Sequence, residues 1–141
     1  MDIRALTPDY AVSPQIARED FAAIKAAGYT TVINNRPDAE NPPHLHHANM
    51  QSAAQALGLT YVQNPVIGGA LTAANVAAQG AAIAASKGPV FAYCASGNRS
   101  SVVWALSNAG KMPTDDLIGL PARFGYQLEG LRSQLDQAAK S

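Results

Sequence analysis

The fold is decided by residues 90–100, Val90-Phe91-Ala92-Tyr93-Cys94-Ala95-Ser96-Gly97-Asn98-Arg99-Ser100. The first four residues are apolar and predict a short buried strand. A small, polar loop follows, and the pattern after the loop predicts a helix from about Ser100 to Asn108. A strand that runs through a loop into a helix is typical of the carboxyl edge of a parallel sheet, where the first helix amides point at the loop. We therefore expect an α/β fold with an anion-binding loop at Cys94.

Short β-rich runs alternate with helical patterns along the rest of the chain. The other expected strands are residues 10–12, at an edge, 29–34 and 59–64. The other expected helices are residues 13–27, 42–57, 72–86 with Thr72 as N-cap, and 127–139 after a break at Pro121 and Gly125. This alternation predicts a single domain over residues 1–141, with a central, mainly parallel sheet flanked by helices.

Length and composition limit the possible functions. The chain has 141 residues, 48% of them hydrophobic, which suits one packed core and not two. Ten Lys and Arg residues balance ten Asp and Glu residues, so no basic field favours nucleic acid or a membrane surface. The least polar run, residues 70–86, is interrupted by polar side chains and predicts a helix rather than a membrane span.

Cysteine usage and the N-terminus suggest a cellular location. A single cysteine, Cys94, cannot form an internal disulfide, which fits a reducing compartment. Residues 1–4 lack the apolar core of a signal peptide. We therefore expect a cytoplasmic protein, and no feature of the sequence predicts an oligomeric state.

The residue types in the loop predict cysteine chemistry on an anion. A thiol at the start of a helix loses its proton readily, so Cys94 is the predicted nucleophile. Arg99 offers a planar fork of donors for an oxyanion, and Ser100 can donate its hydroxyl to the thiolate. The predicted substrate-binding residues are the four between Cys94 and Arg99, whose amides would surround the anion: Ala95, Ser96, Gly97 and Asn98. An inert buried cysteine is the simpler alternative, but it does not explain these neighbours.

Three motifs together resemble a known family. They are Tyr93-Cys94-Ala95-Ser96-Gly97-Asn98-Arg99-Ser100, the upstream run Val32-Ile33-Asn34-Asn35-Arg36-Pro37-Asp38, and the downstream pair Gly125-Tyr126. The set is similar to the phosphatase-like domain of the beta-lactamase hydrolase-like proteins, over nearly the whole chain. The resemblance implies a fold like that of dual-specificity tyrosine phosphatases. Because members of the family are variously described as phosphatases or as sulfurtransferases, the resemblance leaves the reaction open.

Two features favour sulfur transfer. Tyrosine phosphatases use a Cys-x5-Arg loop, whereas four residues separate Cys94 from Arg99, as in the shorter loop of rhodanese-type enzymes. A phosphatase also needs a general acid. Residues 65–70 contain no ionisable side chain, which leaves Asp38 as the nearest substitute. We therefore predict first a sulfurtransferase that carries sulfane sulfur as a Cys94 persulfide, from a small-molecule sulfur donor to a thiol acceptor.

Two alternatives stay open beside this prediction. One is a phosphatase that forms a phosphocysteine from a phosphorylated substrate, and the other is a non-catalytic redox or anion-sensing module. The sequence departs from the family at Ala95, where arginine is common, and at Asn98, where threonine is frequent. The missing positive charge makes a small dianionic substrate a weaker expectation.

Residues outside the loop have weaker functional signals. Arg36 and Asp38 either line the pocket, with Asp38 as a general acid, or form a local turn. Three histidines lie close in sequence, but no cysteine or carboxylate stands at a matching spacing, so no metal site is predicted at His44, His46 and His47. No cofactor is predicted. Tyr126 is expected to anchor the last helix.

Overall fold

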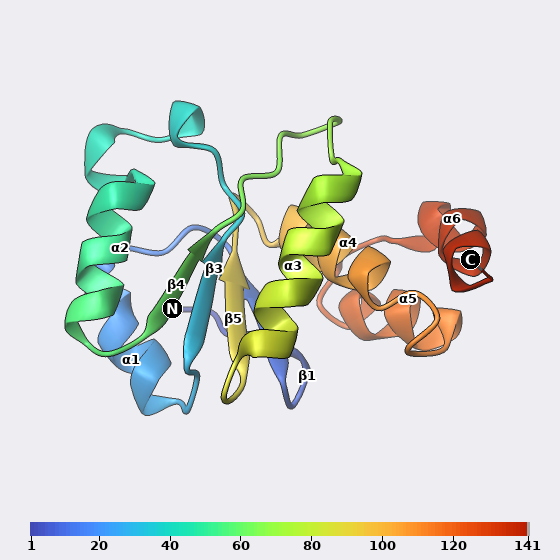
Figure 1. Cartoon of the computed structure of the whole chain (residues 1–141), viewed down its shortest axis with the longest axis horizontal. Helices are drawn as coiled ribbons and strands as arrows, with labels where there is room; N and C mark the ends of the chain where they lie inside the picture. Colours follow the sequence, from blue (N-terminus) through green and yellow to red (C-terminus); the bar gives the residue numbers. More distant parts are fainter. Residues whose placement is uncertain (141) are drawn as a thin grey trace.

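The computed structural model describes residues 1–140 and contains a five-stranded sheet with helices on both faces (Figure 1). The strands are β1 (Arg4–Thr7), β2 (Tyr10–Ser13), β3 (Thr31–Asn34), β4 (Thr60–Gln63) and β5 (Val90–Tyr93), in the order β1-β2-β5-β3-β4. β1 pairs antiparallel with β2, and the other neighbours are parallel. The carboxyl ends of β2 to β5 therefore lie at one edge. This confirms the predicted α/β fold with a mainly parallel sheet.

The helices cover the two faces unequally (Figure 1). One face carries α1 (Phe21–Ala26) and α2 (His47–Ala56). The other face carries α3 (Ala73–Ala85), α4 (Asn98–Ser107), α5 (Thr114–Ala122) and α6 (Arg132–Ala139). Within residues 1–140, no helix has both the length and the apolar character needed to cross a membrane.

Strand residues alternate between the two hydrophobic cores. On β5, Val90 and Ala92 pack in the core beneath α4, α5 and α6, whereas Phe91 and Tyr93 pack in the core beneath α1 and α2. Successive side chains of a strand point to opposite faces, so a strand buried on both faces has to be apolar throughout. This burial fixes the position of β5, from which the loop at Cys94 begins.

Some boundaries follow from local sequence signals. The Oγ1 of Thr72 accepts a hydrogen bond from the amide of Asn75 at 3.1 Å, which confirms the predicted cap of α3. The helix predicted over residues 13–27 is wrong at its start, because α1 begins only at Phe21, after a 3-10 turn at Arg18–Asp20. The terminal helix begins at Arg132 and not at residue 127, after another 3-10 turn at Glu129–Leu131.

Two differences from the expected elements affect the site. β1 is an additional edge strand that the sequence pattern does not predict, so β2 lies inside the sheet and not at its edge. α4 begins at Asn98, two residues earlier than expected. Asn98 and Arg99 therefore belong to the first turn of the helix, which ties the direction of the Arg99 side chain to the helix backbone.

Candidate active site

The cysteine loop, residues 94–99, connects β5 to α4. Gly97 is the N-cap of α4 and has a φ of 97°, a left-handed conformation that favours glycine. This turn brings the Gly97 amide to 3.1 Å from the Sγ of Cys94, to which it donates a hydrogen bond. The Cys94 side chain is fully buried at the base of the loop. The thiol is therefore held by the backbone and faces the positive end of the α4 dipole.

Several loop amides are free to bind an anion. Among the residues that the structure describes, no acceptor is hydrogen-bonded to the amides of Ala95, Ser96 and Arg99. The Asn98 amide instead donates to the Ser96 Oγ at 3.2 Å. Free amides at the start of a helix form a ready site for a negatively charged group. The predicted substrate-binding residues Ala95 to Asn98 are thus brought together in one loop.

Tyr126 fixes the loop from outside. Its hydroxyl donates to the Ser96 carbonyl at 2.7 Å and accepts a hydrogen bond from the Arg4 Nη1 at 2.6 Å. A Cβ atom added at Gly97 would collide with the same hydroxyl. Glycine is therefore required at position 97 for two reasons, its positive φ and the close approach of Tyr126. The sequence predicted only that Tyr126 anchors the last helix, whereas in the structure its hydroxyl also contacts the cysteine loop.

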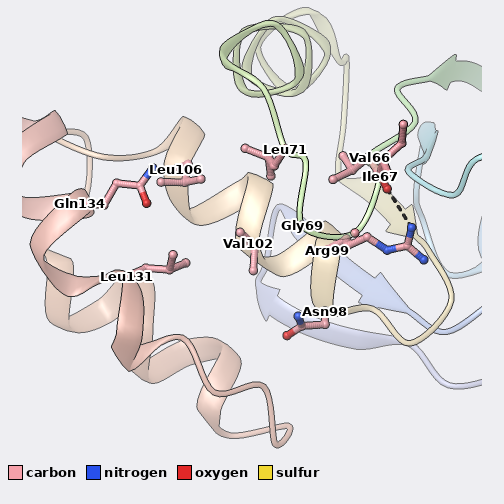
Figure 2. Close-up of a pocket in the computed structure, with 11 residues that line it drawn as sticks. Val66, Ile67, Gly69, Leu71, Asn98, Arg99, Val102, Leu106, Leu131 and Gln134 are labelled. Carbon is pink, nitrogen blue, oxygen red and sulfur yellow. Dashed lines mark hydrogen bonds between the residues drawn. The ribbon is translucent and has the colours of Figure 1, made fainter.

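Arg99 is paired with a carboxylate that the sequence did not single out. Its Nη1 and Nη2 atoms donate to the Oε2 and Oε1 of Glu40, both at 2.7 Å. Nη1 also donates to the Val66 carbonyl at 2.8 Å (Figure 2). Glu40 lies in the 3-10 turn Asp38–Glu40, after β3. The fork of donors predicted to hold an oxyanion is therefore present, and in this structure it holds Glu40.

Arg36 contacts the same carboxylate. Its Nε lies 3.3 Å from the Oε1 of Glu40, and its Nη2 donates to the Glu40 carbonyl at 3.2 Å. The hydrogen bonds from Arg99 lower the pKa of Glu40, against the effect of its partial burial, and Arg36 lowers it further. Glu40 is therefore ionised at neutral pH. Two guanidinium groups share one carboxylate at the mouth of the loop, which leaves a net positive charge there.

The Ser100 hydroxyl does not reach the thiol, contrary to the expectation from sequence. It donates instead to the Oδ1 of Asn35 at 2.8 Å. Asn35 is buried and exchanges hydrogen bonds with Gln79, which also donates to the Tyr10 hydroxyl at 3.0 Å. Tyr10 in turn donates to the Ser100 carbonyl at 2.9 Å. This buried network holds the first turn of α4, so that Ser100 positions the loop and does not contact the sulfur atom.

Asp38 is turned away from the loop and toward α2. Its carboxylate accepts hydrogen bonds from the amide of His47 at 2.8 Å and pairs with the His47 Nδ1 at 2.6 Å. Partial burial acts to raise the pKa of Asp38, but these bonds to His47 outweigh it and hold the pKa below its ordinary value. Asp38 and His47 line a cavity of about 300 Å³. At neutral pH Asp38 is therefore ionised, a poor state for donating a proton.

The histidines serve local structure. The His46 Nε2 lies 2.9 Å from the carbonyl oxygen of Asn41, and His47 pairs with Asp38. Within residues 1–140, no group of three or more His, Cys, Asp or Glu side chains is arranged to hold a metal ion.

This geometry defines a class of protein: a cysteine loop between a central parallel strand and a helix, with arginine in the first helical turn, is the arrangement of a tyrosine-phosphatase-like fold. A kinase-associated phosphatase, solved with its catalytic-site cysteine replaced by serine, shares the fold with a TM-score of 0.69 and 15% identity. The match covers 91% of this chain and 84% of that one. The predicted fold class is thereby confirmed.

The chain belongs to the family of the beta-lactamase hydrolase-like protein, phosphatase-like domain, whose model matches residues 2–111. The beta-lactamase hydrolase-like protein of Xylella fastidiosa strain Temecula1 is 35% identical over 130 residues, which are 91% of this chain and 30% of that protein. A Neisseria meningitidis protein provisionally assigned as a phosphatase is 31% identical, with a TM-score of 0.80. That match covers 98% of this chain and 99% of the other.

These comparisons confirm the predicted family and bear on the predicted reaction. The family is described as phosphatase-like, and the Neisseria meningitidis relative is provisionally described as a phosphatase. The comparisons favour the phosphatase alternative over the sulfurtransferase. The sulfurtransferase was the first prediction from the sequence, and no comparison supports it.

Sequence reasoning did not assign a role in holding the loop to four residues. Asn35 and Glu40 come from the segment after β3, Gln79 from α3 and Tyr126 from the segment after α5, and they meet only in the folded chain. The signal for Glu40 was present in the run Arg36-Pro37-Asp38-Ala39-Glu40, which offers two carboxylates after one strand. Nothing in that run indicates which of the two faces Arg99.

Proposed function

We propose that this domain hydrolyses phosphate monoesters through a phosphocysteine on Cys94. The observation that carries the proposal is the position of the Cys94 sulfur, buried at the base of a loop whose Gly97 amide donates to it and whose Arg99 fork holds the carboxylate of Glu40. The same arrangement supplies a nucleophile and electrostatic stabilisation of the phosphoryl oxygens. The family description as phosphatase-like supports the same assignment.

The proposed reaction has two displacements. The Cys94 thiolate attacks phosphorus, the bond from phosphorus to the ester oxygen breaks, and the alkoxide or phenolate leaves with the electron pair and takes a proton from solvent water. Water then attacks phosphorus, the P–S bond breaks, and inorganic phosphate and the thiolate are released. Arg99 binds two phosphoryl oxygens in both steps, after the substrate has displaced Glu40 from its donors.

Substrates with stable leaving groups suit this site best. Residues 65–70 carry no ionisable side chain, Asp38 is engaged by His47, and Glu40 is engaged by Arg99. With no protonated carboxyl group at hand, expulsion of an alkoxide would be slow, whereas a phenolate needs little protonation. We therefore infer that aryl phosphates are better substrates than alkyl phosphates.

Sulfur transfer is the second candidate function. Two observations favour it, the length of the cysteine loop and the lack of a general acid. The loop has four residues between Cys94 and Arg99, and displacement at sulfane sulfur needs no general acid. In that reaction Cys94 attacks the outer sulfur of thiosulfate, the S–S bond breaks, and sulfite leaves. An acceptor thiolate then takes the sulfur and regenerates Cys94.

One experiment separates the two reactions. The reduced protein is incubated in parallel with an aryl phosphate and with thiosulfate, and its intact mass and released products are followed, with Cys94→Ser as the control. Release of phenol and phosphate, together with a phosphoryl adduct that Cys94→Ser lacks, supports the phosphatase. A stable gain of one sulfur atom, discharged by a thiol, without hydrolysis of the ester, would overturn the proposal in favour of sulfur transfer.

A further inference from the structure

A cavity of about 400 Å³ lies beside the cysteine loop (Figure 2). Its walls come from the loop after β4, from α4, and from the turn that precedes α6. The apolar side chains that line it are Val66, Ile67, Leu71, Val102, Leu106 and Leu131. One end is formed by Asn98 and Arg99, which belong to the cysteine loop. The cavity therefore adjoins the cysteine loop at Asn98 and Arg99, while Cys94 and the residues up to Gly97 do not line it.

The charges around this cavity restrict what it can hold. Among its lining residues, all of which belong to the described part of the chain, Arg99 is the one charged side chain. A second phosphate or carboxylate group placed there would lose water without gaining a cation, which is costly. An uncharged apolar group has no such hydration to lose, and its transfer from water into the cavity is favourable.

The cavity wall also contains apolar surface that the fold does not use. Ile67 is 61% exposed, and neither it nor Leu71 belongs to the two hydrophobic cores. Both side chains lie on the irregular segment between β4 and α3, and Ile67 directly follows Val66, whose carbonyl contacts Arg99. Exposed apolar side chains around a concave site commonly mark the place where a ligand is covered.

We propose that this cavity receives the uncharged aromatic body of the substrate while the phosphate lies in the cysteine loop. The inference rests on the proposed function of Cys94 and adds the substrate class: a phosphate monoester of a large apolar phenol, and not a polyanion. The volume suits a body of two aromatic rings, because pockets for small molecules begin at about 300 Å³. An aromatic body also leaves as a phenolate, which fits a site without a nearby acid.

Binding measured without turnover tests the cavity directly. Biphenyl-4-ylphosphonate and phenylphosphonate, which cannot be hydrolysed, are titrated into the Cys94→Ser protein by calorimetry. The second ring should tighten binding at least about tenfold, since it buries further apolar surface. Leu71→Ser and Ile67→Ser, each added to Cys94→Ser, should cut that ratio several-fold. Phe124→Ser is the matched control, because Phe124 is exposed and lies outside the cavity wall, and it should keep the ratio.

Three results would overturn the inference: equal affinity for the two phosphonates, a ratio that neither Leu71→Ser nor Ile67→Ser changes, or biphenylmethanol binding as tightly as the biphenyl phosphonate. The last result would separate the cavity from the anion loop. Failure of the proposed function looks different. If the wild-type protein hydrolyses neither phenyl nor biphenyl phosphate while the phosphonates keep the expected ratio, the chemistry assigned to Cys94 is wrong and the cavity assignment is supported.

Discussion

Arg99 and Glu40 form a two-pronged ion pair, with both terminal nitrogens of Arg99 at 2.7 Å from the two carboxylate oxygens of Glu40. The carboxylate occupies the donors that an oxyanion substrate would use. Under the proposed function, Glu40 is therefore an internal anion that a substrate has to displace from Arg99.

Replacing Glu40 by glutamine should tighten the binding of small oxyanions. Glu40→Gln removes the competing charge and leaves Arg99 in place, so that the dissociation constant for phosphate should fall roughly two- to fivefold, the value of one partly exposed ion pair. Calorimetric titration measures it, with Glu19→Gln as a control at an exposed position. Weaker binding by Glu40→Gln would show that Glu40 orients Arg99 more than it competes.

The pH dependence of this pair follows from the lowered pKa of Glu40. A carboxyl whose pKa is lower in the folded state stabilises the fold above its ordinary pKa of about 4.3, and the contribution is lost as the pH falls through the lowered value. The affinity difference between wild type and Glu40→Gln should therefore hold from pH 7 to pH 5. A difference that disappears within that range would mean that Glu40 is protonated there.

Arg99→Lys should impair catalysis although it keeps the charge. Lysine cannot donate two parallel hydrogen bonds, so that kcat/KM for an aryl phosphate should fall roughly 100-fold. Steady-state kinetics measures this, with Arg132→Lys as the control, because Arg132 forms exposed pairs with Glu129 and Asp115. Activity retained within a factor of three would remove Arg99 from the phosphate site.

Gly97→Ala should destabilise the protein. The residue would have a φ of 97° and its Cβ would meet the Tyr126 hydroxyl, so the free energy of unfolding should fall by about 3 kcal/mol. Urea denaturation provides the measurement. Gly119→Ala is the matched control, since Gly119 lies in α5 with open space around its Cα, and alanine there should be neutral or stabilising. Equal stability of the two variants would contradict the described turn.

Gln79→Leu should weaken both the fold and the loop. The change removes the buried hydrogen bonds of Gln79 with Asn35, Asn64 and Tyr10, each of which keeps another partner, and should cost roughly 1–3 kcal/mol in the free energy of unfolding. Because Asn35 holds Ser100, kcat/KM should fall as well. Gln55→Leu, at an exposed position of α2, serves as the control. Unchanged stability in Gln79→Leu would show that the network contributes nothing.

Asp38→Asn tests the remaining proposal for a general acid. Because Asp38 is ionised and bound to His47, its loss should not change how steeply log kcat/KM falls with the leaving-group pKa in a series of aryl phosphates. Stability should fall by less than about 1 kcal/mol, as for a partly exposed pair. A steeper dependence in Asp38→Asn would identify Asp38 as the proton donor.

The sequence was sufficient for the fold and for the central part of the site. The apolar run at residues 90–93, followed by a small polar loop and a helix, predicts β5, the loop and α4, because each depends on local propensity and burial. β1 escaped prediction because only one of its four residues, Leu6, is buried, which gives no alternating pattern, and because the strand acquires its partner only from β2.

The partners of the loop could not be predicted, for a different reason. Whether Ser100 faces Cys94 or Asn35 depends on how α4 packs against the end of β3, where Asn35 lies, and no spacing in the sequence reports this packing. The same holds for Asp38 and Glu40, two residues apart on one turn, of which one faces His47 and the other faces Arg99. Such choices are made by tertiary packing and not by local propensity.

The hydroxyl of Tyr126 joins three distant parts of the chain. It is hydrogen-bonded to Ser96, thirty positions earlier, and to Arg4, more than a hundred positions earlier. The loop is therefore held in part by residues from both ends of the chain. A chain cut short before this tyrosine would contain every residue from Cys94 to Arg99 and still lack the hydrogen bond that fixes the Ser96 carbonyl.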